Sequence, residues 1–435
     1  MPKRSQKTGA GSQKEGGGFR ISCWLLASGF WLLPLSSGCA SKAERAAEDA
    51  VQAYFAGDPA RAVQQLRPLA RKPDQNFVLN NARLGSAALI QYDLNEAENA
   101  FLRAYEVLNS FGVNNGGRSL GVILVDEKIR VWRGEPFERA MLNFYLGLVY
   151  YMRQDYGNAR GAFENALFKL RDYADDADRK NADYNEVESN FALAAIMLGK
   201  CWQRLGRDDL AHAAFDRVTQ IRSSLAPLAD YDRNLKSNLL LVVDFGYGPR
   251  KVTDFDGAIA GFAPQPQQEG LIPPPQVSVD GENVDVTGVN EPPIDLLALA
   301  QDRRWQSIDT IRTIKSVVGT GLIWGGAYEA TRHHGNDGTA LALIAAGLLM
   351  KVTSQADVRQ WEMLPRTVFL LPLEVSPGKH DVTVDFPNAP GLKQTWRGLD
   401  VPAQGEATYY FRMQRWNTGP FDWPPPAVAQ ADPMQ

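Results

Sequence analysis

Two pairs of carboxylates have the residue types for acid–base chemistry: Glu135 with Glu138, and Asp357 with Glu362. Paired carboxylates can act as general acid and general base when their surroundings separate their pKa values. Such pairs are also common on solvated helices, where they have no catalytic role. Neither pair belongs to a recognisable catalytic motif, so the sequence favours a structural interpretation of both.

Other reactive side chains are few, because the chain has 4 histidines and 3 cysteines in 435 residues. His333 and His334 are adjacent, but their Gly- and Asp-rich surroundings are typical of an exposed loop. Cys201 lies in an apolar helical pattern that indicates a buried structural thiol. No G-x-S-x-G, H-E-x-x-H or phosphate-loop motif is present. We therefore expect a protein that is not an enzyme and has neither a cofactor nor a metal site.

Cys39 is the cysteine with the clearest sequence context. Five basic residues precede an apolar run at 21–35, and small residues follow it, which is the pattern of a secretory signal peptide. The stretch 35–39, Leu-Ser-Ser-Gly-Cys, resembles the lipobox of bacterial lipoproteins, in which the cysteine is acylated. Ser36 departs from the leucine that is usual there. An ordinary cleaved signal peptide with an incidental cysteine is the alternative.

The lipobox resemblance implies that residues 1–38 are removed and that Cys39 carries the lipid. Two or three acyl chains on one residue give stable membrane anchoring, whereas one chain alone is marginal. Ala40 stands where the inner-membrane retention signal would have Asp. The resemblance therefore implies an outer-membrane lipoprotein of the bacterial cell envelope that faces the periplasm.

The bulk composition predicts a globular protein of more than one domain. Hydrophobic residues make up 44% and charged residues 22% of the 435 positions, which are ordinary globular values. The formal net charge is −4, with acidic and basic residues interspersed. This balance gives no support for a nucleic-acid partner.

Residues 39–235 are helical in pattern and contain three copies of one motif. Each copy has a Leu-Gly pair followed, at fixed distances, by an Ala and a Phe. The copies resemble the tetratricopeptide repeat (TPR), a pair of antiparallel helices of 34 residues. Glycine and alanine are expected where two helices cross closely, and the Phe of the second helix is expected to fill the space between neighbouring helix pairs. The glycines are Gly85, Gly147 and Gly199, and the phenylalanines are Phe101, Phe163 and Phe215.

Stacked repeats of this kind form a concave surface that is lined by the first helix of each pair. The resemblance therefore gives five candidates for partner binding. An alternative is that several of them pack against the two inserts that lengthen the spacing between repeats. The candidates are Phe144, Leu148, Tyr151, Lys200 and Arg204.

Residues 236–415 are predicted to form a C-terminal domain with an antiparallel sheet, because short apolar strands alternate there with Pro-Gly turns. Within it, 308–351 reads as a glycine-rich helical hairpin. Its apolar arms have only 12 residues each, too few to span a bilayer. We favour a hairpin buried against the sheet or a partner over shallow membrane insertion. Residues 416–435 are predicted to be a disordered tail.

Three stretches, at 133–139, 246–249 and 356–365, resemble an uncharacterised family of bacterial lipoproteins with TPR repeats. The family implies no established activity. We expect a structural role for the matching residues, since an Asp–Arg pair beside a Trp readily fixes an interdomain joint. The matching residues are Arg133, Glu135, Glu138, Arg139, Asp357, Arg359 and Trp361.

These patterns predict an α+β protein, with a TPR-like helical solenoid followed by a smaller, mainly β domain. The function they favour is a lipid-anchored scaffold that binds a periplasmic or outer-membrane protein in cell-envelope biogenesis. The alternative is a membrane-active oligomer that inserts its glycine-rich hairpin (317–350).

Overall fold

The computed structural model describes residues 41–110, 131–170, 189–254, 259–265, 272–302, 305, 359–389, 391–414 and 419–425. Contacts between residues divide the chain into two units, 1–42 and 43–435, and the fold below is that of the second. The predicted signal peptide, Cys39, the glycine-rich hairpin and Asp357 lie outside the described residues. The predicted boundary between the two domains at 235/236 stays a prediction.

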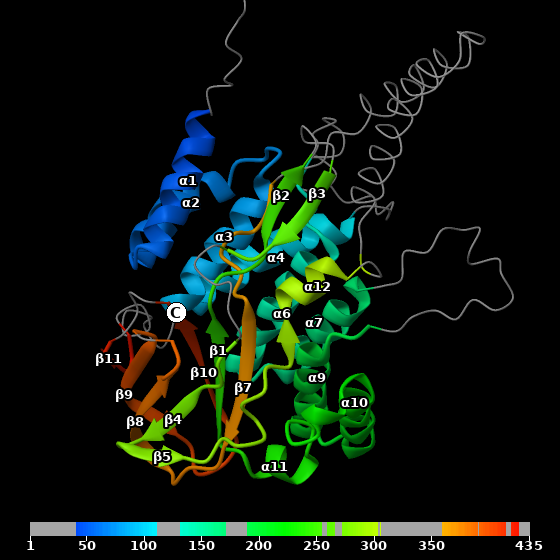
Figure 1. Cartoon of the computed structure of the whole chain (residues 1–435), viewed down its shortest axis with the longest axis vertical. Coiled ribbons are helices and arrows are strands. Elements are labelled where there is room, and N and C mark those ends of the chain that lie inside the picture. Colours follow the sequence, from blue (N-terminus) through cyan, green and yellow to red (C-terminus); the bar gives the residue numbers. More distant parts are fainter. Residues whose placement is uncertain are drawn as a thin grey trace, which may run out of the picture. The chain divides into compact units, whose positions relative to one another are not determined.

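Helices make up the N-terminal part of the fold (Figure 1). Capped turns join some of the helices; for example, the Asp155 carboxylate accepts the N–H of Asn158 at 3.1 Å and starts the helix after it. The helices are α1 (Lys42–Phe55), α2 (Pro59–Ala70), α3 (Phe77–Ile90), α4 (Leu94–Ser110), α6 (Pro136–Met152), α7 (Tyr156–Lys169), α9 (Ala192–Arg204), α10 (Asp208–Ile221), α11 (Tyr231–Lys236) and, further along the chain, α12 (Leu296–Gln301).

Three helix pairs, α3–α4, α6–α7 and α9–α10, share one packing contact. In each pair the glycine of the first helix lies under the Phe ring of the second. A Cβ atom added to any of the three glycines would come within 3.0 Å of that ring. The glycine positions that the sequence predicted for close helix crossing are confirmed by this contact. Of the helices described, none is long and apolar enough to cross a membrane.

Two sheets and a hairpin make up the C-terminal part. The four-stranded sheet has the order β10 (Ala407–Met413), β1 (Leu239–Phe245), β7 (Thr367–Leu373), β6 (Ile294–Asp295). The five-stranded sheet has the order β11 (Phe421–Asp422), β9 (Lys393–Val401), β8 (Gly378–Asp385), β4 (Gln276–Val279), β5 (Glu282–Val284). β2 (Arg250–Asp254) and β3 (Ile259–Ala263) form the hairpin.

The four-stranded sheet lies between the helices and the five-stranded sheet. β1 and β7 are buried along their whole length, which explains why β1 is an almost unbroken apolar run. Because successive side chains point to opposite faces, Asp244 faces α6, where it meets Tyr145, and Phe245 faces Phe386 beside the second sheet, with ring centroids 4.5 Å apart. The expected order, a helical part followed by a sheet-rich part, is confirmed (Figure 1).

The predicted disordered tail is wrong for residues 419–425. Phe421 and Asp422 form β11, which pairs in parallel with Trp396 and Arg397 of β9. Composition suggested disorder because the stretch is rich in proline, but its two aromatic residues find partners on the body of the protein.

Candidate protein-interaction site

Four of the five predicted groove residues are not accessible to a partner. Phe144 and Leu148 are 0% exposed, and Tyr151 and Lys200 are 1% exposed. Phe144 packs between helices, with its ring centroid 5.7 Å from that of Phe163. The prediction that these residues line an open groove therefore needs correction: Phe144 packs among helices, and Tyr151 and Lys200 bond Glu406 of the C-terminal part.

The buried carboxylate of Glu406 contacts the three polar residues among the five, which are Tyr151, Lys200 and Arg204. It lies directly before β10 and receives the Lys200 ammonium on Oε1 at 2.8 Å. The Ser237 hydroxyl donates to the same oxygen at 2.6 Å, and the Tyr151 hydroxyl donates to Oε2 at 2.8 Å. Lys200 also donates to the amide oxygen of Asn234 at 3.0 Å. The cluster is well satisfied, so it holds the start of β10 against α6 and α9.

Burial also sets the protonation behaviour around Glu406. Desolvation lowers the pKa of Lys200, which the negative Glu406 opposes. Desolvation and the same carboxylate both raise the pKa of Tyr151, keeping its hydroxyl a hydrogen-bond donor. Arg204, the fifth predicted residue, is partly buried; it lies 3.6 Å from Glu406 and donates to the Ser237 carbonyl at 3.0 Å. These groups form a structural ion cluster.

A second joint forms around Glu138, which lies in one of the three stretches whose sequence resembles a lipoprotein family. Its carboxylate accepts the backbone N–H of Trp361 at 2.7 Å and that of Glu135 at 2.7 Å. Glu135 in turn pairs with Lys251 of β2 at 2.7 Å. Burial raises the pKa of Glu138 to about 7, against the lowering effect of Lys251. The segment before β7 is thereby attached to the first turn of α6.

The neighbouring side chains strengthen this attachment. The indole N–H of Trp361 donates to the Ser86 hydroxyl of α3 at 3.1 Å. Glu362 forms a bidentate pair with Arg83 at 2.6 and 2.9 Å. Trp132 donates to the backbone carbonyl of Arg359 at 3.1 Å.

All three stretches that carry the family resemblance meet at this joint, although they are far apart in sequence, because the Gly248 N–H also donates to the Leu364 carbonyl at 2.8 Å. Arg359 donates to the backbone carbonyl of Gln75 at 2.7 Å. Arg133 is exposed ahead of α6, and Arg139 is partly buried within it. The carboxylate pairs considered for acid–base chemistry, where they are described, are taken up by backbone N–H groups, Lys251 and Arg83.

A third polar cluster lies between α6 and the four-stranded sheet. The hydroxyls of Tyr145 and Tyr410 both donate to Asp244 Oδ2 at 2.6 Å. Burial raises the pKa of Asp244 to about 6, while the nearby Arg412 and the two hydroxyls lower it. Sequence reasoning missed Asp244 and Arg412. The available signal was a charged residue within an otherwise apolar strand, which usually has a buried partner.

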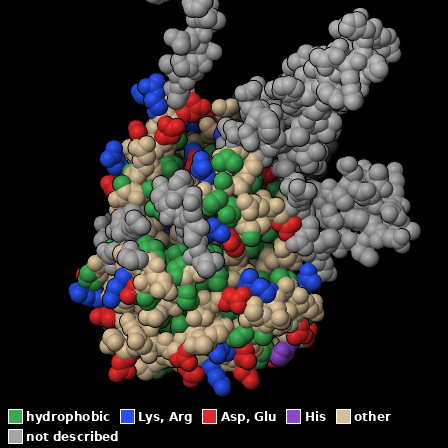
Figure 2. Space-filling view, viewed as in Figure 1, with side chains coloured by type: hydrophobic (Ala, Val, Ile, Leu, Met, Phe, Trp, Pro, Cys, Tyr) green, Lys and Arg blue, Asp and Glu red, His purple; other side chains and the backbone are tan. Residues whose placement is uncertain are grey.

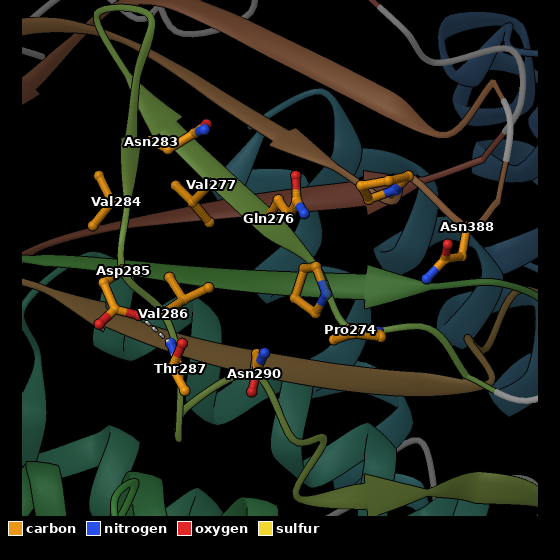
Figure 3. A pocket seen from close by; sticks show the side chains of 12 residues that line it. Pro274, Gln276, Val277, Asn283, Val284, Asp285, Val286, Thr287, Asn290 and Asn388 are labelled. Atoms are coloured by element: carbon orange, nitrogen blue, oxygen red, sulfur yellow. Dashed lines mark hydrogen bonds between the residues drawn. The ribbon is translucent and has the colours of Figure 1, made fainter.

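Two clefts lie beside the edge strand β5 and share Val284 and Asp285. The first has a volume of about 360 Å³, and amide side chains around it include Asn283, Asn290 and Asn388 (Figure 3). The second, of about 430 Å³, lies between β5, α11 and the end of β7, and has both acidic and basic residues. Such linings can form hydrogen bonds with a polypeptide or another polar ligand.

The described residues contain no metal-binding group of the usual kind, and the face in Figure 2 has no basic stripe. No group of three His, Cys, Asp or Glu residues that could hold a metal ion occurs in the described part of the chain. On the face in Figure 2, acidic and basic side chains are interspersed among apolar and neutral ones.

Comparisons with known proteins give little further information. No family model matches the chain, and no curated protein matches it. Two crystal structures of MamA are similar to part of it, at 16% and 17% identity; each similarity covers 43% of this chain and 78% or 76% of MamA. Their TM-scores are 0.28 and 0.29. Similarity of this size supports no conclusion about fold or function.

Proposed function

We propose that this protein is a lipid-anchored adaptor that binds another protein in the bacterial cell envelope. The observation that supports this most is the repeated glycine–phenylalanine contact in three consecutive helix pairs. Glycine-mediated close crossing at a fixed position is the packing expected of a TPR-like solenoid, and solenoids commonly provide extended binding surfaces. We propose that the protein acts by binding rather than by catalysis.

The binding surface that we propose differs from the usual inner face of a solenoid. The polar residues of the inner helices are engaged by Glu406 and by the joint around Glu138. A partner would therefore contact the outside of the body, where the clefts beside β5 provide concave surface. The filled inner face would make the adaptor rigid, because helices and sheets share one core.

The envelope setting depends on Cys39. We propose that acylated Cys39 holds the body at the outer membrane, facing the periplasm. In membrane fractionation, Cys39→Ala should move the folded protein from the membrane fraction to the soluble fraction. Retention of the variant in the membrane would contradict the lipid anchor.

The partner surface can be tested by site-specific photo-cross-linking in native envelopes. A photoreactive residue in place of Asn283, which lines the first cleft, should give one discrete cross-linked species. The matched control is the same residue in place of Asp216, which is exposed on α10. An identical pattern from both positions, or no protein adduct from either, would contradict this surface assignment.

A further inference from the structure

The C-terminal strap, residues 419–425, lies on an aromatic shelf that we define as Tyr92, Trp396 and Tyr409. The ring of Phe421 lies 5.0 Å from that of Trp396 between centroids. The ring of Trp423 lies 5.0 Å from that of Tyr92 and 4.9 Å from that of Tyr409. The strap therefore places two aromatic rings, two positions apart, on three rings of the body.

The shelf is held in place by bonds that do not involve the strap. The Tyr92 hydroxyl accepts the backbone N–H of Tyr410 at 2.9 Å and donates to its carbonyl at 2.6 Å. The Tyr409 hydroxyl donates to the carbonyl of Asp400 at 2.7 Å. Trp396 is part of β9, which also pairs with β8. These contacts would keep the three rings in position if the strap left.

The strap itself is held by few contacts along the strand. Two residues of β11 pair with the nine-residue β9, and one further backbone bond runs from the Trp423 N–H to the Arg397 carbonyl at 2.9 Å. Pro420, Asp422 and Pro424 are exposed. Phe421 and Trp423 are partly buried, so each strap ring buries only part of its surface on the shelf.

The strap also leaves polar groups of β9 unused. The indole N–H of Trp396 and the amide oxygen of Gln394 are buried and have no hydrogen-bond partner among the described residues. Both residues are at most 5% exposed, and their spacing of two places them on one face of the strand. A buried polar group without a partner costs free energy. The strap therefore does not use all of the bonding that this site offers.

We propose that the aromatic shelf is a docking site for an extended segment of a partner protein with aromatic residues two positions apart, which competes with the strap. This inference rests on the proposed adaptor function and adds a second contact with the partner, on β9, three strands away from β5 in the sheet order. Recognition combines pairing with the edge of β9 and the burial of two rings, as in other cases of strand addition. The strap occupies the site by the same chemistry.

The test uses the full chain with Trp423→Ala, which removes the larger anchoring ring of the strap. The probe is a fluorescent peptide with the strap sequence, Gly-Pro-Phe-Asp-Trp-Pro-Pro, and its binding is followed by anisotropy. The wild-type strap competes at an effective concentration in about the millimolar range because it is tethered. We expect the probe to bind the variant at least about tenfold more tightly than the wild type.

Two controls define the result. A peptide with both aromatic residues replaced by alanine should bind neither protein, and Leu235→Ala, at an exposed position on α11, should behave as the wild type. A chain ending at Gln414 serves as a second acceptor, with circular dichroism to verify its fold. Absence of probe binding to both folded acceptors, or equal affinity for wild type and variant, would overturn the proposal. If a partner is cross-linked in envelopes but the peptide does not bind, the adaptor function would still be supported and only the docking site on the aromatic shelf would be ruled out.

Discussion

Lys200 and Glu406 form an ion pair of 2.8 Å in which the side chains are 1% and 0% exposed. They lie 206 positions apart and connect α9 with the start of β10. A buried pair of this kind adds little net stability compared with a well-packed apolar pair, but breaking it leaves a buried charge without its counterion. The pair therefore helps to specify which part of the sheet lies against which helix.

Removal of one partner of this pair should be strongly destabilising. We expect Glu406→Gln to lower the free energy of unfolding by about 3–5 kcal/mol, because Lys200 stays buried without a full counter-charge. Chemical denaturation followed by circular dichroism measures the change. The double variant Lys200→Met with Glu406→Gln should recover part of the loss; if it is no more stable than Glu406→Gln, the coupling is refuted.

The glycine–phenylalanine contact gives a prediction with an internal control. Gly147→Ala should cost at least about 1–3 kcal/mol, because the new methyl group would overlap the Phe163 ring, 2.8 Å away. Gly161→Ala, on the partner helix α7, meets no atom within 4 Å. It should be neutral or stabilising by up to about 1 kcal/mol, since alanine favours helix. Thermal unfolding of both variants decides this, and equal effects would argue against the contact.

The pH dependence of stability follows from three groups whose pKa is raised in the folded state. Burial raises the pKa of Glu138 to about 7 and that of Asp244 to about 6. For His380, the bond with the Asp280 carboxylate at 2.6 Å raises the pKa. In each case the folded protein binds the proton more tightly than the unfolded chain. The stability they contribute is therefore present at low pH and lost as pH rises.

The two carboxylates lose this contribution between their unfolded values, near 4, and about pH 7, and His380 loses it above its unfolded value near 6.5. We expect the free energy of unfolding to fall by roughly 3 kcal/mol between pH 5 and pH 8. Denaturation at both pH values measures the fall. Asp244→Asn should flatten the lower part of the profile, because the amide does not titrate. Stability that increases from pH 5 to pH 8 would show that the sign is wrong.

The Tyr92 hydroxyl covers the open edge of β10. Tyr92→Phe keeps the ring and removes the bonds to the N–H and carbonyl of Tyr410. We expect a loss of about 1–3 kcal/mol, because two buried backbone groups lose their partner. The matched control is Tyr231→Phe, whose hydroxyl bonds Asp208 at an exposed position and which should change stability by less than about 0.5 kcal/mol. Denaturation curves that coincide for the two variants would contradict the edge-covering role.

Much of the helical part could be predicted from the sequence because its contacts are local. Gly147 and Phe163 are separated in sequence by the end of one helix, a short turn and the start of the next helix. The same spacing therefore recurs in each helix pair. Strands such as 239–245 and 367–373 were also recognisable, because residues in a sheet buried on both faces form apolar runs. These features depend on periodicity, which the sequence contains directly.

The sequence alone determined the repeating helix pairs, their close-packed glycines and the change to strands after residue 235. Only the tertiary structure decided that Tyr151 and Lys200 are internal, that Glu138 fastens the Trp361 segment, and that Phe421 and Trp423 return to the body. These relations join residues that are distant in sequence, and their partners are selected by burial and charge pairing between separate elements. Periodicity indicates which face of an element is buried but not which other element covers it.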